Sequence, residues 1–235
     1  MIHRLVLHAL QLVLVAAAAG ALLVALFGIV PPPTTSFILQ SRLGEALRGT
    51  AAPIEYQWMP RDRISPDLLL AVIAAEDQLF SQHRGFDIQA IEKAVDNNRR
   101  GKTIRGASTI TQQVAKNLFL WPGRSYVRKA IEAYFTVVIE MFWSKERILE
   151  CYVNIVQFGE FTYGAEAAAR RFFGVAASEL SREQAALLAS VLPSPAVLRA
   201  DAPSAYVRRR QRWILSQMTA LGGRAHLRKL AGSEG

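Results

Sequence analysis

The sequence predicts an all-α, mainly helical protein with one N-terminal transmembrane helix. Three observations support this fold class: an unbroken apolar stretch from Leu12 to Val30, apolar residues at helical spacing beyond Ser65, and no alternating pattern typical of strands. At 235 residues, the chain has room for one substantial core behind a membrane segment. Helices are expected over about 65–76, 87–98, 108–118, 125–142, 145–155, 164–172, 181–192 and 204–221, with short hairpins only near 48–60.

The apolar stretch is 19 residues long, about the length that crosses a bilayer core as a helix, and the prolines of Pro31–Pro33 stop it. A cleaved signal peptide is the competing interpretation, because Ala16–Ala19 resemble a small-residue cleavage site. The apolar run continues well past these alanines, which favours an uncleaved single-pass anchor. The few charged residues beside the stretch give little information about its orientation in the membrane.

Changes in composition divide the rest of the chain. The segment after the apolar run is rich in Pro, Thr, Ser and Gly, which is typical of a linker. The segment 99–106 is polar, basic and glycine-flanked, so we expect a mobile loop there. The predicted division is a short N-terminal tail at 1–11, the anchor at 12–30, a linker at 31–54, the main domain at 55–222 and a C-terminal tail at 223–235.

Composition narrows the classes of function. The net charge of +9 indicates an anionic partner, which leaves nucleic acid, an acidic bilayer surface or a phosphorylated substrate open. Cys151 is the single cysteine, which excludes an internal disulfide and a Cys/His zinc cluster, and we interpret it as a core residue. Gly101, Lys102 and Thr103 do not complete a P-loop, because Asp96 occupies the position of the first glycine and no strand precedes it.

Glu76 and Asp77 follow a strongly apolar helix, which makes them the first candidates for chemistry. Partial desolvation raises the pKa of such a carboxylate and suits it to accept a proton near neutral pH. The alternative is a polar pair that merely ends a helix in water. His83 and Asp87 lie nearby, but one histidine without a second is more often a structural hydrogen-bonding residue than a metal ligand.

A second candidate group opens the helix expected at 108–118. Ser108 or Thr109 can cap that helix, and Gln112 and Lys116 are four residues apart, so an amide and a cation share one face. Such a face can hold sugar hydroxyls and a phosphate. A solvated helix face is the equally weighted alternative.

A third group combines Arg128 and Lys129 with Glu132, one helical turn on. This arrangement is either a helical salt bridge or a clamp for a phosphate. A fourth stretch, 145–159, carries Tyr152 and Asn154, which we interpret as structural polar residues in a tight helical core rather than catalysts.

Taken in order, the stretches 76–87, 106–117, 128–132 and 145–159 closely resemble the motifs of the peptidoglycan glycosyltransferase, or transglycosylase, family. The segment 210–218 is similar to the family's closing segment, and the resemblance covers roughly 55–222. No Ser-x-x-Lys or Lys-Thr-Gly motif of a transpeptidase is found, so the chain resembles the monofunctional biosynthetic form. The resemblance implies a lysozyme-like lobe and a small membrane-adjacent lobe, with 118–121 as a membrane-dipping part.

The resemblance also implies a reaction. The family polymerises lipid II into β-1,4-linked glycan strands by inverting transfer, with release of polyprenyl (undecaprenyl) pyrophosphate. By this resemblance Glu76 is the catalytic base and Glu132 the second essential glutamate. No cofactor is required, although a divalent cation (Mg²⁺ or Mn²⁺) stays open. The substrate-binding residues implied are Asp77, His83, Ser108, Thr109, Gln112, Gln113, Lys116, Asn117, Arg128 and Lys129.

The expected partners are lipid II, the growing glycan strand, the membrane and cell-wall synthesis or division proteins, with no nucleic acid. The expected location is the cytoplasmic (inner) membrane, with the catalytic domain facing the periplasm or outer side. A lysozyme-like peptidoglycan hydrolase is the leading alternative, but a hydrolase needs no basic pyrophosphate cradle. A catalytically silent glycan-binding scaffold is disfavoured because both glutamates are intact.

Overall fold

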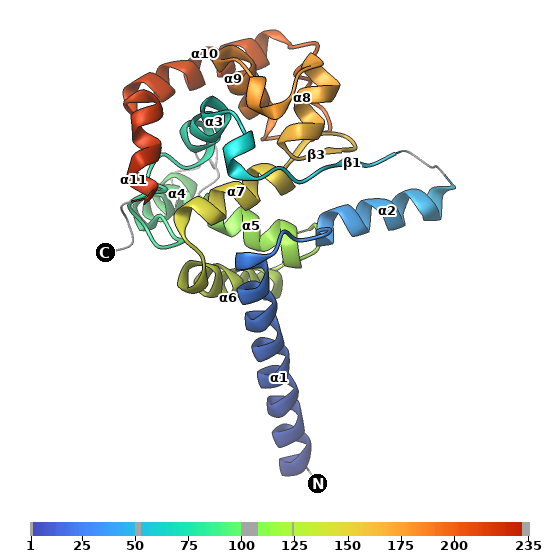
Figure 1. Ribbon diagram of the computed structural model, residues 1–235. Coiled ribbons are helices and arrows are strands. Elements are labelled where there is room, and N and C mark those ends of the chain that lie inside the picture. The colour runs from blue at the N-terminus through green and yellow to red at the C-terminus, as the bar shows by residue number, and fades with distance from the viewer. Residues whose placement is uncertain (1, 50–52, 100–107, 124, 232–235) are drawn as a thin grey trace.

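The computed structural model describes residues 2–49, 53–99, 108–123 and 125–231. Within them the protein is mainly helical, which confirms the predicted fold class (Figure 1). The expected loop at 99–106 falls almost wholly outside the described residues. The α-helices are α1 (Ile2–Ile29), α2 (Ser36–Arg48), α3 (Pro66–Glu76), α4 (Ile88–Arg99), α5 (Ile110–Phe119), α6 (Tyr126–Phe142), α7 (Lys145–Ile155), α8 (Ala165–Phe173), α9 (Arg182–Val191), α10 (Ala205–Ala220) and α11 (Arg228–Ala231). The 3-10 helices are η1 (Arg61–Arg63), η2 (Ala177–Glu179) and η3 (Gly223–Leu227).

The helices from α3 to α10 lie where the sequence predicts them, to within a residue or two at each end. Local capping explains much of this agreement. The side chains of five N-cap residues each accept a hydrogen bond from the backbone N–H three residues on, which satisfies a donor that the helix leaves free. These N-caps are Thr109, Ser125, Ser144, Ser181 and Ser204.

The first helix fits a single-pass membrane anchor. Helix α1 begins at Ile2, so it also includes most of the segment expected as a tail. Within its stretch His3–Ile29, an 18-residue window has a mean hydropathy of 2.7, and 6% of that window is buried inside the protein. Figure 1 shows α1 projecting away from the remaining helices. A helix of this length and composition is long and apolar enough to cross a bilayer.

The C-terminal end of α1 is nevertheless docked on α6 and α7. The Trp143 Nε1 donates to the carbonyl of Val24 at 2.7 Å, and the Arg147 guanidinium donates to Phe27 O at 2.7 Å and Val30 O at 3.1 Å. The last carbonyls of a helix lack partners within it, so the bonds from Arg147 satisfy groups that would otherwise need water. The anchor and the domain are therefore joined by side-chain contacts as well as by the chain.

Helix α2 occupies much of the segment predicted as a linker. Thr35 caps its start, and Gly49 ends it with a left-handed φ of 69°. The sequence analysis missed this helix because its short apolar pattern lies among linker-type residues. Leu39, Leu43 and Leu47 recur at helical spacing along α2 and are exposed.

The run 118–121 was predicted to dip into the membrane, and the structure corrects most of that prediction. Leu118 and Leu120 are buried, and Phe119 stacks on Phe135 of α6 with ring centroids 4.3 Å apart. Of the four side chains, Trp121 alone is exposed. These three side chains therefore pack against protein rather than lipid, and Phe119 joins α5 to α6.

A small sheet is the only strand structure among the described residues. Strand β3 (Thr162–Tyr163) pairs in parallel with β1 (Glu55–Tyr56) and antiparallel with β2 (Gln157–Gly159). The hairpin therefore lies at 157–163, not at 48–60 as predicted, and the earlier segment adds one edge strand. A pairing partner more than 100 residues away is invisible to a local sequence pattern.

Helix α3 forms the centre of the domain. The side chains of Leu68 to Ala74 are all buried, and α7, α9 and α10 pack around them (Figure 1). The segment expected as a C-terminal tail contributes η3, which packs on α3, and α11, which packs on α7. An ion pair from Arg224 to Asp67 secures this contact at 2.5 Å. The residues that end α3 therefore lie on a rigid support.

Gly164 provides a test of the packing between α7 and α8. Its φ is +87°, and a Cβ would lie 2.4 Å from the backbone oxygen of Asn154. We expect Gly164→Ala to lower the free energy of unfolding by more than about 2 kcal/mol, because backbone strain and a clash act together. Gly174, with φ +69° and open space, is the matched control, and Gly174→Ala should cost about 1 kcal/mol. Equal shifts in thermal unfolding would contradict this account.

Candidate active site

Glu76 is the last residue of α3, and its carboxylate lies between two other helices. Gln113 of α5 donates its Nε2–H to Glu76 Oε2 at 3.1 Å. On the other side, Arg210 of α10 donates from Nη2 to Glu76 Oε1 at 3.1 Å. The Glu76 side chain keeps 17% of its surface exposed, so a substrate can still reach it.

The surroundings of Glu76 suit a general base. Burial raises the pKa of the Glu76 carboxyl above its usual range, while the Gln113 hydrogen bond and the Arg210 charge oppose that rise. A carboxylate with a raised pKa accepts a proton more readily near neutral pH. The geometry thus confirms the desolvation that the sequence predicted for this carboxylate.

Tyr152 of α7 orients the Gln113 amide. Its side chain is fully buried, and its hydroxyl donates to Gln113 Oε1 at 3.3 Å. Burial raises the pKa of Tyr152 well above its usual value, so the hydroxyl keeps its proton. With Oε1 accepting from Tyr152, the amide presents its N–H groups to Glu76. Tyr152 is therefore a buried structural residue, as predicted, but one that supports the site.

Asp77 links the end of α3 to the start of α5. Its Oδ1 lies 2.9 Å from His83 Nε2, and its Oδ2 accepts from the backbone N–H of Ile110 at 3.0 Å. Both oxygens of this buried carboxylate are thus engaged by the protein. Negative charge is also favourable at a helix N-terminus. The observed geometry gives Asp77 and His83 a positioning role, and direct substrate contact stays a prediction.

The start of α5 is further held by a capping box. Thr109 accepts from the backbone N–H of Gln112, and Gln112 Oε1 accepts from the backbone N–H of Thr109 at 3.0 Å. The Thr109 hydroxyl also donates to Gly85 O at 2.7 Å. Gln112 is therefore occupied by the cap, and Gln113 rather than Gln112 shares with Lys116 the side of α5 that faces Glu76.

Lys116 lies one helical turn beyond Gln113 and is partly buried. Burial lowers the pKa of its ammonium group; the negative charge of Glu132 opposes this, and the positive charges of Arg128 and Lys129 add to it. Within the described residues Lys116 forms no ion pair, and its Nζ lies 5.7 Å from the ring centroid of Phe37. A cation in this state gains most from an anionic ligand.

Glu132 is held by two cations of its own helix. Arg128 Nη1 lies 2.8 Å from Glu132 Oε2, and Lys129 Nζ contacts Glu132 Oε1. Glu132 and Arg128 are buried, whereas about half of the Lys129 side chain is exposed. The third candidate group is therefore both a salt bridge and a cluster of cations next to Lys116.

The structure brings most of the predicted site residues together around the two glutamates. Ser108 is exposed beside Thr109, and Asn117 is buried one residue after Lys116. Sequence analysis assigned no site role to Arg210, although it lies in the segment that resembles the family's closing segment. Its ion pair with Glu76 joins residues 134 positions apart, so only the fold reveals it.

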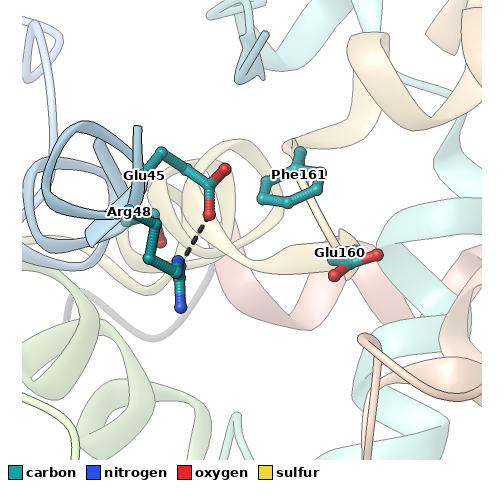
Figure 2. A pocket seen from close by; sticks show the side chains of 5 residues that line it. Glu45, Arg48, Glu160 and Phe161 are labelled. Carbon is teal, nitrogen blue, oxygen red and sulfur yellow. Dashed lines mark hydrogen bonds and ion pairs between the residues drawn. The ribbon is translucent and has the colours of Figure 1, made fainter. Parts of the chain in front are cut away.

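Two other observations delimit the site. A separate hollow between α2 and the turn joining β2 to β3 is lined by Ser41, Glu45, Arg48, Glu160 and Phe161 (Figure 2). Figure 2 shows Arg48 directed at Glu45, with Glu160 and Phe161 across the hollow, and none of these belongs to the predicted site. Across the described residues, no three His, Cys, Asp or Glu side chains gather as a metal cluster.

A buried glutamate beside a group of cations, on a helical domain joined to an apolar helix that fits a membrane anchor, suits an enzyme that transfers glycosyl groups. Comparison with known proteins agrees. The model of the family described as Transglycosylase matches residues 44–219. A protein of Pseudomonas fluorescens (strain SBW25) is 53% identical over 91% of this chain and 89% of its own length, and one of Pseudomonas putida (strain W619) is 54% identical over 92% of each. Both are named biosynthetic peptidoglycan transglycosylase. The chain belongs to the transglycosylase family.

Asp77 offers a test of how the site is supported. We expect Asp77→Ala to lower the free energy of unfolding by about 3 kcal/mol or more, because two buried partners of a charged group lose their acceptor. Asp201 pairs with Arg199 at the surface, so Asp201→Ala is the control and should cost no more than about 1 kcal/mol. Thermal unfolding of both variants measures the difference, and similar shifts would argue against the structural role of Asp77.

Arg210 offers a test of the electrostatics. The Arg210 charge lowers the pKa of Glu76, so its removal raises that pKa further and moves the acidic limb of the pH–activity profile to higher pH. We expect Arg210→Ala to lose more kcat/KM at about pH 6 than at about pH 8.5, and Arg210→Lys to restore part of the profile. Arg212→Ala, a change at an exposed neighbour, is the control. A uniform loss at every pH would contradict an effect through Glu76.

Proposed function

We propose that this enzyme polymerises lipid II into β-1,4-linked peptidoglycan glycan strands by inverting glycosyl transfer, with Glu76 as the base. The observation that carries this proposal is the placement of Glu76. Its carboxylate is largely buried, has a raised pKa and lies on the same side of α5 as Lys116, a cation without an ion pair among the residues that the structure describes. The names of its relatives support peptidoglycan synthesis as the process.

The reaction is a displacement at an anomeric carbon. Glu76 removes the proton from the 4-hydroxyl of the acceptor, lipid II, and that oxygen attacks the anomeric carbon of the growing strand. The bond from this carbon to the polyprenyl pyrophosphate breaks, and the leaving group departs with the electron pair. Attack opposite the leaving group converts an α linkage into a β linkage. A carboxylate whose pKa is raised by burial serves the first event.

The leaving pyrophosphate needs charge stabilisation more than protonation. Lys116, Arg128 and Lys129 surround Glu132, so three cations against one carboxylate leave a net charge of +2. We assign the pyrophosphate to this cluster, where fixed cations stabilise the charge that develops on it. Glu132 then acts by holding Arg128 and Lys129 in place. A pyrophosphate at Lys116 would also offset the cost of its burial.

The remaining predicted contacts are Ser108, Gln112, Gln113 and Asn117, with His83, Asp77 and Thr109. Gln113 has the strongest support, because its amide already touches Glu76. The other residues lie on α5 or near the end of α3 and the start of α5. We propose that they hold the site in place or bind the saccharide. A divalent cation would be held by the oxygens of the pyrophosphate, since both oxygens of Glu132 contact protein cations.

We further propose that the domain works on the outer side of the cytoplasmic membrane, where lipid-linked precursors are consumed. Docking of α1 on α6 and α7 supports a catalytic domain held at the bilayer surface. The exposed Leu39, Leu43 and Leu47 of α2 give that domain an apolar edge for lipid. Cell-wall synthesis or division proteins are the partners expected there.

The proposal is tested with Glu76→Gln in purified full-length enzyme given labelled lipid-linked disaccharide-pentapeptide. We expect polymer formation to fall by at least about 100-fold, because the amide keeps the shape and loses the basicity. The melting temperature should hold or rise: the raised folded-state pKa means that the ionised carboxylate destabilises the folded protein above that pKa, and the neutral amide removes this cost.

Products are resolved by size. Polymer made at a near wild-type rate by the variant, with unchanged melting, would refute Glu76 as the base. If the wild-type enzyme makes no polymer but cleaves preformed glycan, the hydrolase alternative holds instead.

A further inference from the structure

One side of α10 carries four side chains in a row, at spacings of four, three and four residues: Tyr206, Arg210, Trp213 and Gln217. Residues at these spacings lie on one side of a helix. The buried side of α10 is a neighbouring one, formed by Val207, Ile214 and Met218, which faces α3 and α9. The row therefore borders the core without being part of it.

This row of side chains passes beside Glu76, the proposed base. Arg210 contacts Glu76 Oε1, and two turns further Gln217 Oε1 accepts from Gln78 Nε2 at 3.2 Å. The guanidinium carbon of Arg210 lies 6.0 Å from the ring centroid of Trp213. Trp213 is thus one contact away from Glu76, through a residue that touches both.

The two aromatic members of the row are open to solvent. Tyr206 is 47% exposed and Trp213 44% exposed. They are seven residues apart, so they face the same way and lie roughly 10 Å apart along the helix. Exposed aromatic surface of this size beside a catalytic group is typical of a binding site.

The two oxygens of Glu76 define which part of the substrate this row can meet. Oε2 faces Gln113 on α5, the helix that also carries Lys116. Oε1 faces Arg210 on α10. If the pyrophosphate lies with Lys116 and Arg128, as proposed above, the donor occupies the α5 side. The acceptor, whose 4-hydroxyl must reach the same carboxylate, is left with the α10 side.

We propose that Tyr206 and Trp213 form a stacking platform for the amino-sugar rings of the acceptor glycan, beside Glu76. The faces of pyranose rings present C–H groups, and an aromatic face carries partial negative charge that attracts them. The ligand class is a β-1,4-linked N-acetylated saccharide. This inference rests on the proposed function for its choice of acceptor over donor, but the platform can be tested without turnover.

The first experiment measures binding of a soluble probe, chitotetraose, to the full-length protein in detergent by isothermal titration calorimetry. We expect the wild-type signal to change on titration, Trp213→Ala to raise the dissociation constant by about tenfold, and Tyr206→Ala to raise it less. Trp213→Phe should bind nearly as the wild type, because a ring is kept. Trp121→Ala is the matched control, since Trp121 is exposed to a similar degree at the junction of α5 and α6.

The second experiment measures polymerisation by Trp213→Ala as a function of lipid II concentration. We expect KM to rise by about tenfold while kcat changes little, because Glu76 and its partners are untouched. Unchanged KM, or a fall confined to kcat, would overturn the acceptor assignment. A melting temperature close to that of the wild type is the check on folding.

The outcomes separate the two proposals. Polymer formation by a wild-type protein that shows no chitotetraose binding would overturn the platform and leave the function standing. Saccharide binding that depends on Trp213, in a protein that makes no polymer, would keep the platform and overturn the proposed function. Equal loss of binding in Trp213→Ala and Trp121→Ala would overturn the platform.

Discussion

The carboxylate of Asp77 is the constraint on which the rest of the site depends. It ends α3 one residue after Glu76, and its second oxygen holds the backbone of Ile110, where α5 begins. This single side chain therefore determines how the helix that carries the base meets the helix that carries Gln113 and Lys116. A buried charge is tolerable there because both of its oxygens are engaged by the protein. Catalytic geometry and local stability thus depend on the same hydrogen bonds.

Charge is segregated around Glu76. The base receives one cation, Arg210, from α10, while the three cations near Glu132 belong to α5 and α6. A single positive partner limits the rise in pKa that burial causes without fully cancelling it. The larger cationic group lies where a doubly charged leaving group would need it. In the proposed reaction, proton removal and departure of the leaving group would therefore depend on separate groups of charges.

Much of the helical fold follows from local sequence, and much of the site does not. Caps such as Thr109 and Ser125 act within one turn, so the ends of their helices could be predicted. Glu76 could be singled out as the candidate base because an apolar helix ends at this residue. Helix α2 and the pairing of β1 with β3 could not be predicted from local patterns, because each is stabilised by contacts distant in the chain. Arg210 was missed for the same reason, and the role of Gln112 in the capping box was not foreseen from the sequence.

The hydrogen bonds from Trp143 and Arg147 to the last turns of α1 restrict how the domain moves relative to this helix. A flexible linker would let the domain tumble, and its distance from the lipid would vary. When the end of a membrane helix is docked on the domain, the domain keeps two motions. It diffuses within the plane of the bilayer and rotates about the bilayer normal. Encounters with lipid-linked sugars then become a search in two dimensions. In the proposed reaction, the growing polymer would therefore have to move away from a domain that stays beside the bilayer.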